Sequence, residues 1–187
     1  MLRWILATSI LVGLGSSASA QMTGFCLPGM SGVTTCPCAN PPTSTGPGCD
    51  NFGPTPPGGS GGALLSSTGA STVGTTTTFQ FVISGEQGTV TVLFCGTTTI
   101  AAGVPFGAGV RCVGGNVIRS YKGQLTAGGI HFPNATSPTD AWTRSGMPPS
   151  GTTRYYYAVY RNTAAVGPCG SSSANINATN AGAVTWT

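Results

Sequence analysis

The residues best suited to covalent chemistry are four cysteines in one stretch, Cys26 to Cys49, which reads CLPGMSGVTTCPCANPPTSTGPGC and holds no charged residue. Their spacing is C-x9-C-x-C-x10-C. A zinc site would need C-x-x-C pairs or nearby histidines, and the only histidine is His131. A redox centre would need C-x-x-C at a helix start. The sequence therefore predicts disulfides here, and no metal.

Two pairings remain open among these four cysteines. A bond between Cys36 and Cys38 would close a strained ring around Pro37. The alternatives are Cys26–Cys36 with Cys38–Cys49, or Cys26–Cys38 with Cys36–Cys49.

Three further cysteines make the total odd. Cys112 and Cys169 lie in turn-like sequence, VRCVGG and VGPCGSS, so we predict a bond between them. Cys95 lies in the strand-like run TVTVLFCG, where we predict a buried, unreactive thiol.

Side chains for acid–base catalysis are scarce, because the carboxylates are only Asp50, Glu86 and Asp140. General acid–base catalysis needs paired titratable groups. His131 and Asp140 flank a predicted loop, and with Ser137 or Ser145 they have the residue types of a catalytic triad. No G-x-S-x-G motif, however, presents a serine as a nucleophile. The GGSGG run at 58–62 lacks the lysine and helix of a phosphate-binding loop. We expect no enzyme and no cofactor, with a hydrolase as the weaker alternative.

Three aromatic residues are the candidates for binding. Trp142 lies in the predicted loop TDAWTRSGMPP and is the first choice for a ligand contact. Tyr156 and Tyr160 share one face of a predicted strand, which is either the solvent face or the interface with a second sheet. Exposed rings would stack on sugars, so polysaccharide is the alternative partner. The basic residues are scattered, which argues against nucleic acid.

These candidates need elements to position them. Residues 1–20 have a basic Arg3, an apolar run and a small-residue ending, and they predict a signal peptide. Removing it changes the net charge from +4 to about +3, since six basic residues then face three acidic ones. No later run is long enough to span a membrane. We therefore expect a secreted or cell-surface protein, which suits disulfides.

The rest of the chain divides into two segments. Residues 21–62 form a disulfide-stabilised segment and a Pro/Gly/Ser linker, and residues 63–187 form the main domain. The main domain alternates β-branched and aromatic runs with glycine turns, so it predicts an antiparallel β-sandwich, with a closed barrel as the lesser option. The expected strands lie within residues 63–69, 75–85, 89–100, 116–123, 128–133, 153–161 and 183–187.

The order of short motifs resembles an uncharacterised secreted Cys/Gly-rich β-domain of planctomycete-type bacterial exported proteins. The shared motifs are CPC…GC, GALL, RCVGG, TRYYYAVYRN and GPCG…VTWT. The resemblance implies export and a β-fold, with no established activity. Met30 and Ala108 stand where it would place Asp, so it carries no calcium site over to those turns. The sequence thus favours a non-catalytic surface module that meets surface proteins or polysaccharide.

Overall fold

The computed structural model describes residues 21–43, 46–51, 61–126, 129–161 and 176–187. The predicted signal peptide, most of the linker and Cys169 lie outside these residues. No helix in the described part is long and apolar enough to cross a membrane. The described elements are β1 (Thr23–Phe25), β2 (Leu64–Thr68), β3 (Gln80–Ser84), β4 (Val90–Gly96), β5 (Thr98–Phe106), β6 (Gly109–Gly114), β7 (Ile118–Gln124), β8 (Ile130–Phe132), α1 (Ala141–Arg144), β9 (Thr153–Arg161) and β10 (Ile176–Thr185).

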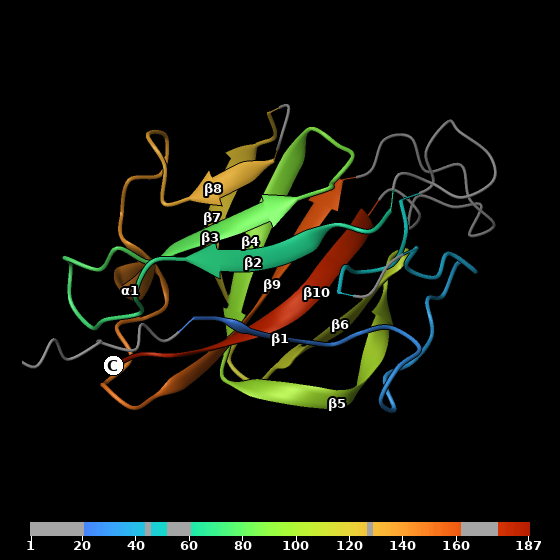
Figure 1. Ribbon diagram of the computed structural model, residues 1–187, viewed down its shortest axis with the longest axis horizontal. Coiled ribbons are helices and arrows are strands. Elements are labelled where there is room, and N and C mark those ends of the chain that lie inside the picture. The colour runs from blue at the N-terminus through green and yellow to red at the C-terminus, as the bar shows by residue number, and fades with distance from the viewer. Residues whose placement is uncertain (1–20, 44–45, 52–60, 127–128, 162–175) are drawn as a thin grey trace, which may run out of the picture.

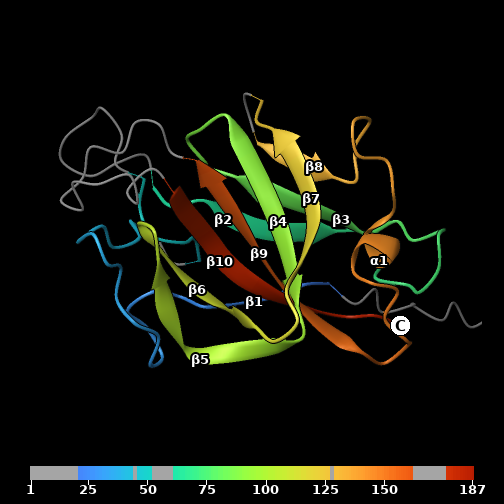
Figure 2. The same cartoon turned by 180° about the vertical axis from the view of Figure 1, so that it is seen from behind.

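The predicted all-β, antiparallel architecture is confirmed. A five-stranded sheet runs in the order β1-β10-β9-β4-β7, a three-stranded sheet in the order β2-β3-β8, and β5 pairs with β6 (Figures 1 and 2). Every strand pair is antiparallel. The five-stranded sheet is central, because both smaller sheets pack on it.

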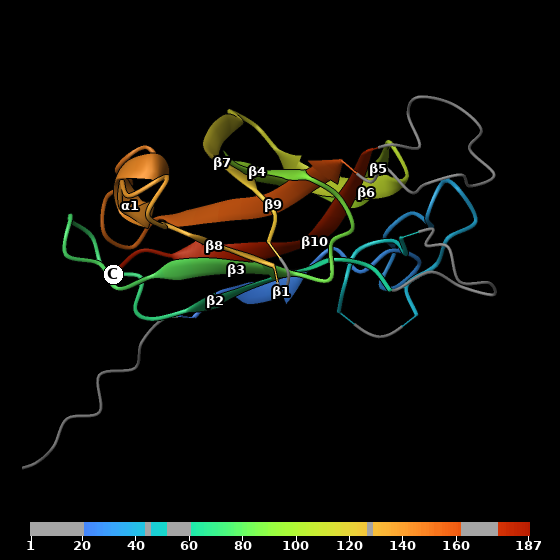
Figure 3. The same cartoon turned by 90° about the horizontal axis from the view of Figure 1, so that it is seen from above.

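Each face of the central sheet meets a different core. On one face, Phe81 and Ile83 of β3 join Leu93, Tyr156 and Trp186 in an aromatic cluster between the two larger sheets. Figure 3 shows β2 and β3 on one side of β4 and β9. A second cluster lies on the other face, where the β5–β6 hairpin and the N-terminal coil (residues 26–43 and 46–51) pack on the sheet. Its buried residues are Cys26, Cys49, Val110, Cys112, Val113, Tyr157, Ala178 and Ala181. The architecture is therefore a sandwich with an extra partial layer.

Strand β9 follows the predicted alternation. Tyr156 and Ala158 face the aromatic cluster, whereas Tyr157 and Val159 face the second cluster. Tyr156, Tyr157 and Tyr160 are buried, so these tyrosines are packing residues.

The structure differs from the predicted strands at residues 89–100. This run forms two strands, β4 and β5, and β5 then folds back onto β6. Gly96 makes the fold-back possible, since an added Cβ there would lie 2.4 Å from Val113 Cγ1 and 2.6 Å from the Gly114 carbonyl oxygen. The hairpin thereby covers one end of the central sheet.

The disulfides correct the predicted pairing. Cys26 is bonded to Cys112, and Cys36 to Cys49. The predicted Cys112–Cys169 bond is therefore wrong, and so is either predicted partner of Cys26. The Cys36–Cys49 bond of the second alternative is confirmed, and the Cys38–Cys49 bond of the first is wrong. The error arose because the β5–β6 hairpin, which brings Cys112 over the coil, was not foreseen.

The remaining cysteines complete the pattern. Cys95 is buried and free, as predicted. Cys38 is disulfide-bonded as well.

Peptide mapping without reduction tests this pairing. We expect a Cys26 peptide linked to a Cys112 peptide, a Cys36 peptide linked to a Cys49 peptide, and alkylation of Cys95 only after unfolding, because the folded chain buries that thiol. A linked Cys112–Cys169 peptide would contradict the structure.

Candidate functional site

Tyr156 lies in the core rather than on a binding face. Its ring packs against Phe81 with centroids 4.6 Å apart, and the residue is fully buried. The hydroxyl donates to Ser145 Oγ at 2.6 Å and accepts from Trp186 Nε1 at 3.1 Å. Burial raises its pKa well above the ordinary value. This residue cannot stack on a ligand in the folded protein.

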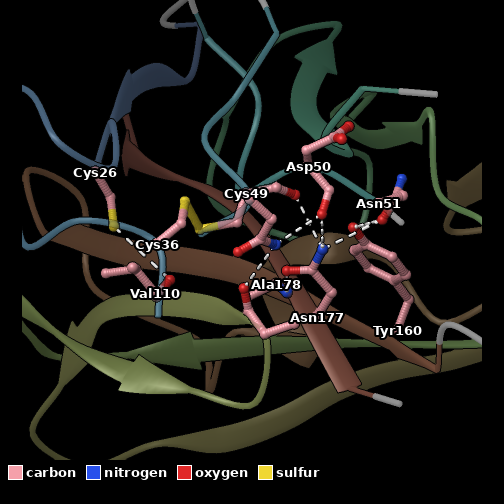
Figure 4. The surroundings of a disulfide bond; sticks show 11 residues. Cys26, Cys36, Cys49, Asp50, Asn51, Val110, Tyr160, Asn177 and Ala178 are labelled. Carbon is pink, nitrogen blue, oxygen red and sulfur yellow. Dashed lines mark hydrogen bonds between the residues drawn. A yellow bond between two sulfur atoms is a disulfide. The ribbon is translucent and has the colours of Figure 1, made fainter. Parts of the chain in front are cut away.

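Tyr160 is also buried, and its hydroxyl belongs to a polar network that we call the asparagine cluster, formed by Asn51, Asn177 and Tyr160 (Figure 4). The Tyr160 hydroxyl donates to Asn51 Oδ1. Asn177 Nδ2 donates to the carbonyl oxygens of Cys49, at 2.9 Å, and Asp50, at 3.3 Å. The cluster therefore joins the coil around the Cys36–Cys49 bond to β9 and β10.

Close backbone contact accompanies these hydrogen bonds. A Cβ added at Gly48 would lie 2.1 Å from the Ala178 carbonyl oxygen, so only glycine lets the coil approach β10 this closely. On the other side of the coil, Asn40 Nδ2 donates to the carbonyl oxygens of Asp50, at 2.8 Å, and Ala108, at 3.1 Å. The asparagine cluster thus stabilises the packing of the coil on β10, and it is not an open site.

Trp142 lies in α1, not in a free loop. Asp140 caps this helix, and its Oδ1 accepts from the Thr143 backbone N–H at 2.8 Å. The indole Nε1 donates to the Pro148 carbonyl oxygen at 2.9 Å, and the half-buried ring packs against the aromatic cluster. Of the two alternatives for the face of Tyr156 and Tyr160, the structure shows the buried one, so Trp142, Tyr156 and Tyr160 do not share an exposed face.

The polar residues considered for catalysis serve other contacts. Ser145 Oγ donates to the Ala141 carbonyl oxygen at 2.6 Å, and Ser137 Oγ donates to the Lys122 carbonyl oxygen at 3.5 Å. His131 is exposed on β8. Within the described residues no hydrogen bond or ion pair joins these side chains into a triad, and no group of three His, Cys, Asp or Glu residues could hold a metal.

Two titratable groups are shielded from solvent. Burial raises the pKa of the Cys95 thiol to about 11, so at neutral pH the thiol is protonated. Burial also raises the pKa of Glu86, whose two carboxyl oxygens are inaccessible. Neither group is presented to a substrate.

Two surface hollows meet at Val90 and Lys122. The first has a volume of about 620 Å³ and includes Gln124, Ile130 and His131. The second has a volume of about 450 Å³ and lies over the uncovered part of the central sheet; its lining is Val90, Val92, Lys122, Val159, Tyr160, Arg161 and Ile176. We call the two joined hollows the basic track.

The register of the central sheet explains how the basic track forms. Val92 pairs with Val159 on one side and with Lys122 on the other, so these three side chains lie in one row on one face. Arg161 follows Val159 by two residues and returns to that face. The side chains of Lys122 and Arg161 are exposed, and no carboxylate lines either hollow.

Comparison with known protein families, with characterised proteins and with solved structures finds no match. The resemblance to secreted planctomycete-type domains stays a prediction.

Sequence reasoning missed both the asparagine cluster and the basic track. Asn51 and Asn177 are 126 residues apart, and only the folded chain brings them together. Lys122 and Arg161 looked scattered, because the strand register that unites them has no local sequence signal. The alternation of β7 and β9 could have placed each on a face, but not beside the other.

Replacing Asn177 tests the asparagine cluster. In Asn177→Ala the buried carbonyl group of Cys49 loses its donor, whereas that of Asp50 keeps the donor from Asn40, so we expect the free energy of unfolding to fall by about 1–3 kcal/mol. Asn116→Ala, at an exposed position, should change it by less than about 0.5 kcal/mol. Denaturant unfolding measures both, and equal effects would rule out the stabilising role.

The buried tyrosines predict a loss of stability in alkali. Burial raises the folded-state pKa of Tyr156 and Tyr160 above the ordinary value of 10.0, so the folded state holds these protons more tightly than the unfolded state does. Their contribution is complete below pH 10 and is lost as the pH rises further. We expect the free energy of unfolding to fall above pH 10 by up to about 1.4 kcal/mol per pH unit for each tyrosine. Absorbance should show both tyrosinates forming only with unfolding; their titration near pH 10 in folded protein would contradict this.

Proposed function

We propose that this protein is an exported, non-catalytic module that works outside the cytoplasm as a structural or interaction unit. The observation that carries the proposal is the covalent fastening of the N-terminal coil to the β-domain by Cys26–Cys112, with Cys36–Cys49 closing the coil itself. Such bonds persist in oxidising compartments and are rare in the cytosol.

The distribution of titratable groups supports a non-catalytic role. The Cys95 thiol and the Tyr156 hydroxyl are buried, and Asp140 caps a helix. A catalytic site would need such groups converging on an open cavity. The described hollows instead present aliphatic and basic side chains.

Carbohydrate binding through exposed aromatic rings finds little support as a second function. Tyr156 and Tyr160 are buried, and Trp142 is half-buried with its N–H already bonded. If the module meets a partner, the basic track is the better candidate surface.

Export and protease resistance test the proposed function together. Full-length protein produced with residues 1–20 should be recovered outside the cytoplasm with its disulfides formed. The double variant Cys26→Ser/Cys112→Ser should be cleaved by thermolysin about tenfold faster or more, because the coil loses its link to β6. Asn116→Ala is the control and should keep the wild-type rate to within about twofold, because Asn116 is exposed. Recovery in the cytoplasm with seven free thiols would overturn the proposal.

A further inference from the structure

The basic track is elongated across the strands. Its two hollows share Val90 and Lys122, so they form one continuous surface from β8 at one end to β9 and β10 at the other. Strands β10, β9, β4 and β7 lie side by side beneath it (Figure 2). With neighbouring strands about 4.8 Å apart, these four strands alone give a width of about 14 Å. This shape suits a linear chain better than a compact ligand.

The side chains of the basic track divide into a floor and a rim. The floor is aliphatic and includes Val90, Val92 and Val159. The rim carries Lys122 and Arg161, and Gln124 adds an amide that can donate and accept. In the described part of the chain, no hydrogen bond or ion pair engages these three rim side chains. All three side chains are exposed at the surface, where a ligand can contact them.

The positive charge of the basic track is not neutralised by the carboxylates of the mature chain. Asp140 is engaged at the N-terminus of α1. Asp50 is buried in the coil, only 4% exposed. Glu86 has both carboxyl oxygens buried and lines neither hollow. Arg119 on β7 pairs with Phe94 on the same face and adds to the positive field.

We propose that the basic track binds a linear acidic polysaccharide whose carboxylates pair with Lys122 and Arg161. The C–H faces of the sugar rings lie over Val90 and Val92, and the Gln124 amide meets ring hydroxyls. Charge-assisted hydrogen bonds from the ammonium and guanidinium groups supply the preference for acidic sugars. This inference rests on the proposed function, because such polymers lie outside the cytoplasm.

The size and chemistry of the basic track favour a polysaccharide over a protein or a membrane. Hollows of about 450 and 620 Å³ match those that hold small ligands. A stable protein partner would need about 800 Å² of surface with an aromatic-rich centre. A membrane contact would need exposed Trp, Phe or Leu residues, whereas this floor is made of half-buried valines.

The experiment measures binding of the oxidised full chain to polygalacturonate by calorimetry at low salt. We expect binding that weakens as salt is added, and a loss of about tenfold or more in Lys122→Gln/Arg161→Gln. The double variant Arg144→Gln/Arg154→Gln removes the same charge away from the basic track and should bind within about twofold of wild type. Lys122→Arg/Arg161→Lys keeps both charges and should retain most of the affinity.

Several outcomes would overturn the inference. Equal losses in the two charge-removing variants would indicate attraction by net charge alone. Equal binding of fully methyl-esterified polygalacturonate would show that carboxylates are not recognised. Failure to bind polygalacturonate, with or without binding to polyglutamate or to phosphatidylserine vesicles, would exclude the acidic polysaccharide.

This failure is distinguishable from failure of the proposed function. Export, disulfide pairing and protease resistance do not involve Lys122 or Arg161. A chain that is exported and bridged but does not bind polygalacturonate would therefore refute only the inference about the ligand. Thermal unfolding of each variant shows whether it is folded before binding is measured.

Discussion

The structure depends on how the N-terminal coil is held against the central β-sheet. This coil is rich in glycine and proline and has no helix or strand of its own. Such a coil loses much conformational entropy on ordering and buries little apolar surface in return. The Cys26–Cys112 bond joins residues 86 positions apart and the Cys36–Cys49 bond residues 13 apart. In the chain-entropy model, loops of these lengths stabilise the fold by about 4.6 and 2.9 kcal/mol. Asn177 then supplies donors to the coil's carbonyl groups, so the backbone beside the second bond is not left unsatisfied.

This fastening explains why the two faces of the central sheet differ. One face packs Phe81, Tyr156 and Trp186 against the three-stranded sheet and needs no cross-link. The other face has only the short β5–β6 hairpin and the coil above it, and these layers are too thin to build a large apolar core. Disulfides and buried amides replace the missing apolar area there. Among the described residues the hairpin covers only one end of the sheet, and the row of Val159, Val92 and Lys122 lines a hollow.

The sequence predicted whatever depends on local pattern. The alternation of residues 153–161 predicted a strand with two usable faces, and the strand-like setting of Cys95 predicted a buried thiol; both are confirmed. The partner of Cys112 and the role of Asn177 depend on which strands become neighbours, and no local signal carries that information. The run 89–100 looked like one strand because its residue types favour strand throughout, whereas the turn is set by the space at Gly96. Tyr160 could be assigned to a face but not to the core, since an aromatic residue satisfies either environment.

Burial of the aromatic rings changes where recognition can occur on this molecule. The Tyr156 hydroxyl donates a hydrogen bond to Ser145 and its ring packs against Phe81, so neither part of the side chain can contact a partner. Two charged side chains are accessible instead, Lys122 on β7 and Arg161 on β9. Strand β4 lies between these two strands and sets the distance between the two positions. Side chains on strands keep their spacing better than side chains on loops. Less conformational entropy of the protein is therefore lost when a polymer binds. The same sheet that buries the tyrosines therefore positions the cations, and specificity on this face comes from spacing and charge instead of ring stacking.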